Sequence, residues 1–472
     1  MIAARRYWSC AFPIFFLLFS LPGALRFPGS LGVFAAFSIT SGLLIALALP
    51  SPRLYSYSFF AAFLSLGFFL KLQAFLILEA GLIEPMGQFS GSPSEWNQVL
   101  KVCTAGIAGV VIARAAHLLW LRGRSRPAGG LGEPPPGWYI QWRRWIWSAA
   151  LGITLAISVW NFKVSFYQVG VIPAMVLPMH LNVLAGWMLY IGLAMLFAVL
   201  LYWEIGFNPK NCHLVFLALI CEAVVTSSSM LTRAGYLFHT VPCLVVMVSH
   251  FRETATILSK LKMAILLGAF IVGFLASLGT VSILRVFTYP MSPAERFPNG
   301  AIQSESLRQR IDSMTRQVCS LFVGRWIGLE GVGAVSSYKA LGPSLLRDGL
   351  REDPGHGVSS IYQRISQSLY KPLNSFVFLT IPGIVAVLDY SGSLGVVFLG
   401  MVLATMLLLG TELVASRLIC NPFFLSLVGI SLANALCQMN FPYLAAVFFI
   451  EQWGAILVVG VVIRGWRASQ FV

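Results

Sequence analysis

The chain alternates long apolar runs with short polar gaps over most of its length. Runs such as Leu31 to Leu49 and Met263 to Leu284 reach the roughly 18 residues that a bilayer span requires. In hydrocarbon every backbone group must bond within its own segment, so runs of this length are helices. The pattern predicts an all-α polytopic integral membrane protein of about 12 (12–14) transmembrane helices, with nine of them in residues 1–285. A short outside loop is expected from Glu84 to Gln98, before the fourth span.

The number of spans depends on the segment from Asn374 to Asp389. It is apolar but short, and Pro382 and Gly383 interrupt it. If it crosses the membrane, the total is thirteen and the C-terminus lies outside. If it is a half-helix, the total is twelve and Arg417 lies inside. The second arrangement fits the positive-inside rule better, so we expect both termini in the cytoplasm.

One long polar interruption divides the chain at residues 286–372. It carries ten Lys or Arg and seven Asp or Glu, whereas other polar gaps are short. We predict an N-terminal helix bundle (1–285), a large periplasmic loop (286–372) and C-terminal transmembrane helices (373–472). Within the loop, apolar residues recur at helical spacing between Ser306 and Phe322, which predicts an amphipathic helix on the membrane surface.

Composition agrees with a membrane protein and excludes several other classes. The chain is 58% hydrophobic and 10% charged, with a net charge of +15. The positive charge gathers in short gaps, above all in the Pro/Gly-rich stretch from Arg122 to Arg144, which we expect to be a flexible cytoplasmic linker. No stripe combines basic and aromatic residues, so nucleic-acid binding is not expected. Cys319 is the only cysteine of the loop and no Cys/His cluster occurs, so we expect neither a loop disulfide nor a metal.

Charged residues inside apolar runs are candidates for function, because each is costly in a membrane unless it is paired or hydrated. Lys71, Glu79, Arg114 and Glu222 are of this kind, and a structural ion pair is the simpler explanation for them. Arg233 follows a run of serines at the predicted outer end of the seventh span. It is either an interfacial anchor or a substrate-binding residue in a polar cavity.

Loop arginines suit phosphate, because a guanidinium group makes forked contacts with its oxygens. Arg325, Arg347, Arg351 and Arg364 are candidate binding residues, although a solvated face explains any one of them equally well. Arg325 differs from the others because glycines surround it and permit close approach of a ligand. The neighbouring Trp326 offers an aromatic face for a sugar.

Two loop residues are candidate bases. Glu330 lies five residues after Arg325, and His356 is the only histidine of the loop. The turn-rich surroundings of His356 also fit a solvated histidine without a catalytic role. No Ser-His-Asp spacing, phosphate loop or dinucleotide fingerprint occurs, so soluble hydrolases and ATP-driven pumps are not supported.

Five short segments stand out between about the fifth span and the C-terminus. They are Ser229 to Gly235, Gly324 to Gly331, Ile381 to Gly383, Tyr390 to Ser393 and Gln438 to Tyr443. Together with the order of parts over that region, these motifs resemble the O-antigen polymerase (Wzy-type) family of bacterial oligosaccharide repeat-unit polymerases.

The resemblance implies a membrane glycosyltransferase of the bacterial inner membrane with a periplasm-facing active site. Such an enzyme moves a growing glycan from undecaprenyl diphosphate to a hydroxyl of a new lipid-linked repeat unit. It implies Arg325, Glu330 and His356 as catalytic residues, with arginines binding the diphosphate and no metal or cofactor. Its partners would be lipid-linked oligosaccharides, membrane lipids, a chain-length regulator and a flippase.

Two alternatives remain open from the sequence. An O-antigen ligase shares the bundle and the long loop, and a loop histidine such as His356 fits its pattern. A transporter of lipid-linked glycans or small molecules belongs to a different class. It is typically recognised by internal repeats and by helices broken at mid-membrane, and no internal repeat is visible in this chain.

Overall fold

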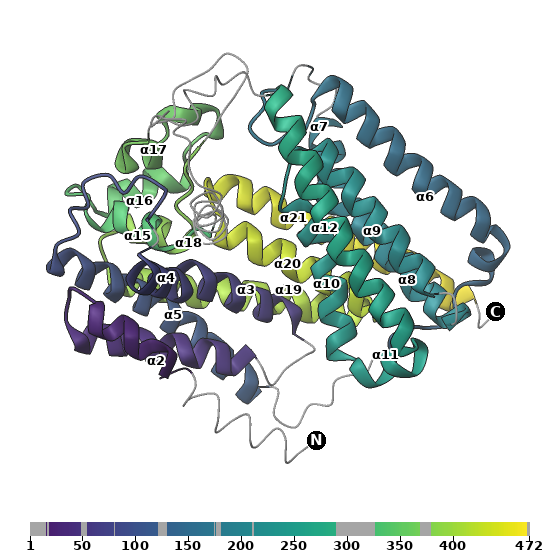
Figure 1. The fold of residues 1–472 in the computed structure, drawn as a ribbon, viewed down its shortest axis with the longest axis horizontal. Coiled ribbons are helices and arrows are strands. Elements are labelled where there is room, and N and C mark those ends of the chain that lie inside the picture. Colours follow the sequence, from purple (N-terminus) through teal and green to yellow (C-terminus); the bar gives the residue numbers. More distant parts are fainter. Residues whose placement is uncertain are drawn as a thin grey trace, which may run out of the picture.

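A computed structural model of the chain describes residues 16, 18–48, 54–79, 81–120, 130–173, 175, 181–209, 212–288, 326–368 and 379–469. These residues form helices joined by turns, and no β-strand occurs among them. The helices run side by side in a bundle, with the four short elements α15 to α18 gathered at one end (Figure 1). We call this end of the molecule the loop end.

Within the described residues, nine helices are long and apolar enough to cross a membrane, as expected for a multi-pass membrane protein. Two shorter apolar helices, α10 (Gly235–Ser249) and α20 (Pro422–Cys437), lie in the same bundle. The nine are α2 (Leu31–Ala48), α3–η1–α4 (Tyr55–Leu78), α5 (Pro93–Trp120), α6 (Gly137–Val164), α7–η3–α8 (Leu181–Phe207), α9 (Cys212–Ser229), α12 (Lys260–Thr288), α19 (Leu394–Leu418) and α21 (Pro442–Ser469).

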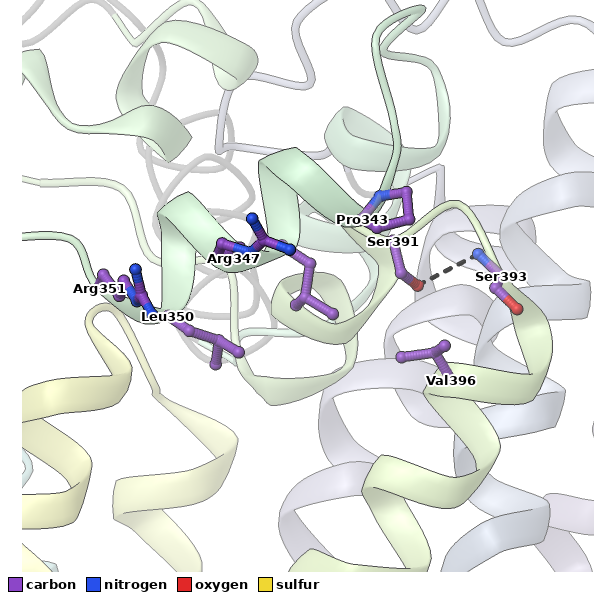
Figure 2. Close-up of a pocket in the computed structure, with 8 residues that line it drawn as sticks. Pro343, Arg347, Leu350, Arg351, Ser391, Ser393 and Val396 are labelled. Atoms are coloured by element: carbon purple, nitrogen blue, oxygen red, sulfur yellow. Dashed lines mark hydrogen bonds between the residues drawn. The ribbon is translucent and has the colours of Figure 1, made fainter.

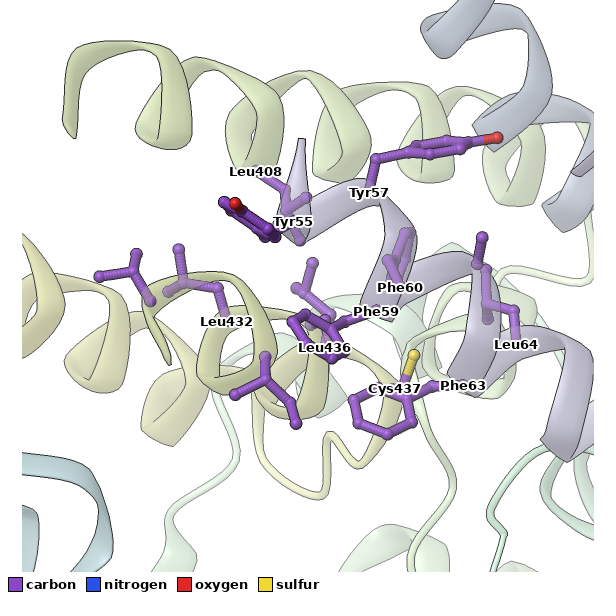
Figure 3. Packing of buried hydrophobic residues seen from close by; sticks show 14 of the residues in the cluster. Tyr55, Tyr57, Phe59, Phe60, Phe63, Leu64, Leu408, Leu432, Leu436 and Cys437 are labelled. Carbon is purple, nitrogen blue, oxygen red and sulfur yellow. The ribbon is translucent and has the colours of Figure 1, made fainter. Parts of the chain in front are cut away.

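The core lies where α3 packs between α19 and α20 (Figure 3). Tyr57, Phe60 and Leu408 are fully buried there. The Glu412 carboxylate of α19 accepts the backbone N–H groups of Tyr55 (2.7 Å) and Ser56 (2.9 Å), which satisfies two free donors at the start of α3. A buried carboxylate therefore fixes where α3 begins.

The outer helices expose apolar side chains instead of burying them. Leu403, Val461 and Val272 are 66–71% exposed on α19, α21 and α12. Large apolar side chains exposed on several long helices are unusual for a protein in water but normal for one that faces lipid. The exposed apolar faces of the outer helices therefore agree with helices that lie in a membrane, as their apolar composition predicted.

The polar interruption folds where the structure describes it. Residues 326–368 contain α15 (Leu329–Ser336), α16 (Pro343–Leu350), the 3₁₀ helix η5 (Pro354–Ser359) and α17 (Ile361–Ser366). The segment is tied to the gap between α4 and α5, because Gly87 N–H donates to Ser366 O (3.0 Å). The predicted amphipathic helix, Ser306 to Phe322, lies outside the described residues.

The described part of the apolar segment before α19, residues 379–389, contains one helix, the six-residue α18 (Ile384–Asp389). At 1.5 Å per residue it is about 9 Å long, too short to cross a bilayer. Gly383 precedes it with φ +75° and donates its N–H to Met439 O (3.0 Å). The described part of this segment therefore behaves as a half-helix at the loop end.

Two predicted boundaries are wrong. The stretch from Arg122 to Arg144 is not a linker throughout, because α6 begins at Gly137 and Arg143 forms an ion pair with Glu204 of α8. The predicted loop from Glu84 to Gln98 is also shorter, because α5 begins at Pro93. In both cases the helix extends beyond its apolar part, and hydrophobicity alone does not reveal the polar turns.

Candidate functional site

The segment from Trp326 to Gly333 docks into the bundle through close backbone contacts. Gly67 lies in the π-helix η1 (Ser65–Leu70), and its Cα faces the Ile327 carbonyl so closely that a Cβ atom would overlap it. A Cβ at Gly328 would stand 2.6 Å from Gly67 O, and one at Gly331 would overlap Pro382 O. The glycines here allow the protein's own backbone segments to pack closely, whereas we had expected them to allow the close approach of a ligand.

A buried ion pair fixes the same segment. Lys71 of α4 contacts the Glu330 carboxylate and also donates to the Trp326 carbonyl (2.7 Å). The side chains of Lys71 and Glu330 are 1% and 3% exposed. Burial raises the pKa of the Glu330 carboxyl, and Lys71 opposes that shift. Glu330 and Trp326 are thus brought together, but Glu330 faces the interior and the Trp326 ring packs against Phe63, with ring centroids 5.7 Å apart.

Two of the candidate arginines share one groove at the loop end. Arg347 and Arg351 are one turn apart at the end of α16, on the same side of the helix (Figure 2). We call this the arginine groove; it has a volume of about 610 Å³. Its lining is Pro343, Leu346, Arg347, Leu350, Arg351, Ser391, Ser393 and Val396.

The arginine groove combines cationic, hydroxyl and apolar groups. Arg347 and Arg351 are exposed, and the described residues place no carboxylate in an ion pair with either. Ser391 Oγ accepts the Ser393 N–H (3.2 Å) opposite them, at the turn from α18 to α19 (Figure 2). Leu350 is 50% exposed beside the guanidinium groups. Such a surface matches an amphiphile with an anionic head group.

His356 and Arg364 lie away from that groove. The His356 side chain is 60% exposed in η5, with Nδ1 3.9 Å from Glu352 Oε1. The same carboxylate oxygen accepts the Ile361 N–H (2.6 Å), and Arg364, the exposed residue of the otherwise buried helix α17, adds positive charge nearby. Burial raises the pKa of Glu352, while these partners lower it. The contacts of His356 are those of a solvated turn histidine.

Arg233 occupies a different position. It is half-buried in the turn between α9 and α10, and these helices pack mainly on α6, α8, α12 and α20. Arg233 is not among the residues that line the arginine groove. Arg325 and Cys319 both lie outside the described residues. Within the long polar segment, the described part begins at Trp326, the residue after Arg325.

Asp389 is a titratable group that we did not predict. It is 2% exposed at the end of α18, and its Oδ2 accepts the Ser336 hydroxyl (3.0 Å) of α15. Burial raises its pKa to about 7, and the Ser336 hydrogen bond opposes that shift. It is two residues from Ser391 in the arginine groove. The sequence feature that could have identified Asp389 is its position as the single aspartate at the end of a short apolar run.

A second groove at the loop end was also missed, although the segment from Gln438 to Tyr443 had been noted. We call it the aromatic groove; its volume is about 540 Å³. It opens between α7, the start of α21 and the turn that joins α20 to α21. Its lining is Phe166, Tyr167, Pro173, Asn182, Val183, Trp187, Tyr190, Ala435, Gln438, Met439, Asn440, Phe441, Leu444, Ala445, Phe448 and Glu451.

The charged residues inside the spans are mostly paired, as the simpler explanation predicted. Glu222 contacts His239 Nδ1 with both carboxylate oxygens (3.1 Å each). Arg114 lies 3.0 Å from His117 Nδ1, and its guanidinium stacks over Tyr57 at 4.9 Å. Within the described residues no three His, Cys, Asp or Glu side chains gather as metal ligands would.

The loop end thus has three features that bear on function: the arginine groove, the aromatic groove and the buried Lys71–Glu330 pair. A scan against protein-family models and searches of curated proteins and of solved structures found no match to the chain.

Proposed function

We propose that the protein is a glycosyltransferase of the bacterial inner membrane that polymerises lipid-linked oligosaccharide repeat units into a surface polysaccharide. Its substrates would be glycans carried on undecaprenyl diphosphate, and transfer would take place at the periplasmic face. The observation that carries the proposal is the arginine groove. It sets two exposed guanidinium groups among apolar side chains at the ends of membrane helices.

The chemistry of such a substrate fits this groove in two ways. A diphosphate needs charge-assisted donors, and paired arginines supply them in forked geometry. A polyprenyl chain needs an apolar surface beside the head group, and Leu346, Leu350 and Val396 provide it. As the glycosyl bond to the diphosphate breaks, negative charge grows on the leaving oxygen, where the guanidinium groups would stabilise it without a metal.

The reaction also fits the polar groups nearby. The anomeric carbon of the growing glycan would leave the diphosphate oxygen and bond to an acceptor hydroxyl. That hydroxyl would lose its proton to a base or to the departing diphosphate. Asp389, whose pKa is raised to about 7, and the predicted bases Glu330 and His356 are the candidates at the loop end.

The membrane arrangement that we propose has twelve spans, with both termini in the cytoplasm and residues 286–372 in the periplasm. The half-helix α18 supports twelve rather than thirteen. In this arrangement Arg143, Arg144, Lys260, Lys262 and Arg417 lie at cytoplasmic helix ends, as the positive-inside rule requires.

The test uses Arg347→Ala and Arg351→Ala, singly and together, in cells that lack the native gene. We expect the double variant to lose long polysaccharide and to accumulate single lipid-linked repeat units. Lys339→Ala, an exposed cation of the same loop outside the groove, is the control and should retain the wild-type chain lengths. Wild-type chain lengths in the double variant, at equal protein levels, would reject the proposal.

One observation favours a transporter as second candidate. The side chains of Glu222 and His239 are fully buried, and His239 Nε2 also reaches the Tyr190 carbonyl (2.8 Å). The His239 ring thus lies between a carboxylate and a carbonyl oxygen inside the bundle. Buried pairs of this kind carry protons in proton-coupled transporters. Proton-dependent uptake into vesicles, abolished by His239→Gln and unaffected by the double arginine variant, would favour this alternative.

A further inference from the structure

The aromatic groove carries buried polar atoms that lack partners. Trp187 Nε1 and Asn440 Oδ1 both line it, and neither has a hydrogen-bond partner among the residues that the structure describes. One is a donor and the other an acceptor. Buried polar groups are nearly always paired, so two unpaired groups on the wall of one groove point to a ligand that both donates and accepts.

The charge of the groove restricts that ligand. Glu451 is half-buried on its wall, and no Lys, Arg or His lines it. Glu451 lies nine residues into α21, about 13 Å from the start of the helix, within an apolar span. A carboxylate at such a depth is costly without a polar contact and would repel a phosphate. The groove therefore suits a neutral or amino-bearing ligand.

Aromatic side chains supply the remaining surface. Trp187, Tyr190 and Phe448 line the groove, and Tyr190 and Phe448 pack edge to face with ring centroids 5.5 Å apart. The Tyr190 hydroxyl accepts from Asn434 Nδ2 (2.7 Å), which fixes its ring. Aromatic faces accommodate the apolar C–H faces of a sugar ring, while its hydroxyls both donate and accept. The volume of about 540 Å³ falls within the roughly 300–1,000 Å³ of small-molecule sites.

The two grooves lie at opposite ends of α18. Gly383 precedes this helix and bonds to Met439 of the aromatic groove, whereas Ser391 and Ser393 follow it and line the arginine groove. The helix itself is about 9 Å long. A ligand head group in the arginine groove and a sugar in the aromatic groove would thus be one short helix apart.

We propose that the aromatic groove binds the carbohydrate part of a glycan. Trp187 Nε1 donates to a hydroxyl, and Asn440 and Glu451 accept from hydroxyl or amino groups. The inference rests on the proposed function for the ligand class, and it assigns the sugar to a groove distinct from the one that takes the diphosphate. An acyl chain fits the aromatic surface but leaves the three polar groups without partners.

Photo-crosslinking in the native host tests the inference. The photoreactive residue p-benzoylphenylalanine replaces Phe448 in the groove or, as control, Trp145, which is 71% exposed on α6. Purified adducts are hydrolysed in acid, and the released monosaccharides are identified by mass spectrometry to reveal carbohydrate. We expect carbohydrate-bearing adducts from position 448 and only phospholipid adducts from position 145.

Polar variants in the same background give the second measurement. Glu451→Gln keeps the shape of the side chain and removes its charge, whereas Trp187→Phe keeps an aromatic ring and removes the N–H donor. Each variant should lower the yield of carbohydrate adduct roughly tenfold. Trp145→Phe should leave that yield unchanged. Phospholipid adducts alone at position 448 would overturn the inference. A third outcome separates the two proposals: carbohydrate adducts form at position 448, but the double arginine variant still makes full-length polymer. That outcome would keep the groove assignment and reject the proposed function.

Discussion

Lys71 of a membrane helix and Glu330 of the long polar segment form an ion pair in the interior, although they are 259 residues apart in the sequence. The same ammonium group donates to the Trp326 carbonyl (2.7 Å). Beside this pair, Gly67 and Gly328 bring the two backbones into direct contact. One charge pair and two glycines thus hold the loop against the bundle.

Breaking this pair should destabilise the protein strongly. Lys71→Met or Glu330→Leu leaves one buried charge without its partner, which typically costs about 3–5 kcal/mol. We expect each single variant to lower the thermal midpoint of the purified protein, as measured by tryptophan fluorescence. The double variant Lys71→Met/Glu330→Leu should recover most of the loss, because it leaves no uncompensated charge.

Polymerisation activity distinguishes a purely structural role of the Lys71–Glu330 pair from a catalytic role of Glu330. If Glu330 only docks the loop, the double variant should polymerise glycan once it is folded. A stable double variant without any polymer would instead assign Glu330 to the chemistry. Arg26→Ala is the control, because its contact with Glu79 (3.6 Å) is exposed and should contribute little.

Asp389 should make stability depend on pH. Burial raises its pKa from 3.8 to about 7, so the folded protein favours the protonated form. This contribution is complete below about pH 4 and is lost as pH rises through 7; a shift of this size is worth a few kcal/mol at most. Asp389→Asn mimics the protonated form, so its thermal midpoint should exceed that of the wild type at pH 8 and match it near pH 4.

The exposed Asp348 provides the comparison for that experiment. Asp348→Asn makes the same chemical change at an exposed position of the loop end, and its thermal midpoint should follow that of the wild type at each pH. An Asp389→Asn variant whose midpoint follows the wild type at every pH would contradict the raised pKa.

The twelve-span arrangement makes a prediction about the two sides of the membrane. Alkaline phosphatase fused after Lys339 should be active, because the enzyme needs the oxidising periplasm, whereas the same fusion at Val472 should be inactive. Green fluorescent protein fused at Val472 should fluoresce. Active phosphatase at both positions would support thirteen spans and an outside C-terminus.

The sequence predicts the bundle well because lipid imposes a strong rule on each span: an apolar run of sufficient length must be a helix. It fails at Gly137 and Pro93, where polar turns extend the helices through pairs such as Arg143 with Glu204. The site is harder to predict. Arg347 and Arg351 were named from residue type. The aromatic groove, by contrast, depends on the fold placing Trp187 and Glu451 on the wall of one groove, and no spacing in the chain encodes that arrangement.

Arg325 remains the strongest catalytic prediction from the sequence, and the docked loop sharpens its test. It directly precedes Trp326 in the sequence, and the Trp326 carbonyl accepts a hydrogen bond from Lys71 at the loop end. If its guanidinium makes a forked contact with the diphosphate, an ammonium group cannot replace it. Losing the contact should cost about 2–4 kcal/mol of transition-state stabilisation, roughly 30- to 1,000-fold in rate.

The comparison that decides the role of Arg325 is lysine against alanine. Arg325→Lys should shorten the polysaccharide nearly as much as Arg325→Ala, whereas Arg310→Ala, on the polar face of the predicted loop helix, should be close to silent. Chain-length distributions in cells lacking the native gene, at matched protein levels, give the measurement. Full-length polymer from Arg325→Lys would show that positive charge alone suffices there. Arg347 and Arg351 would then be the remaining candidates for forked diphosphate binding, because they share a groove with apolar side chains suited to the lipid.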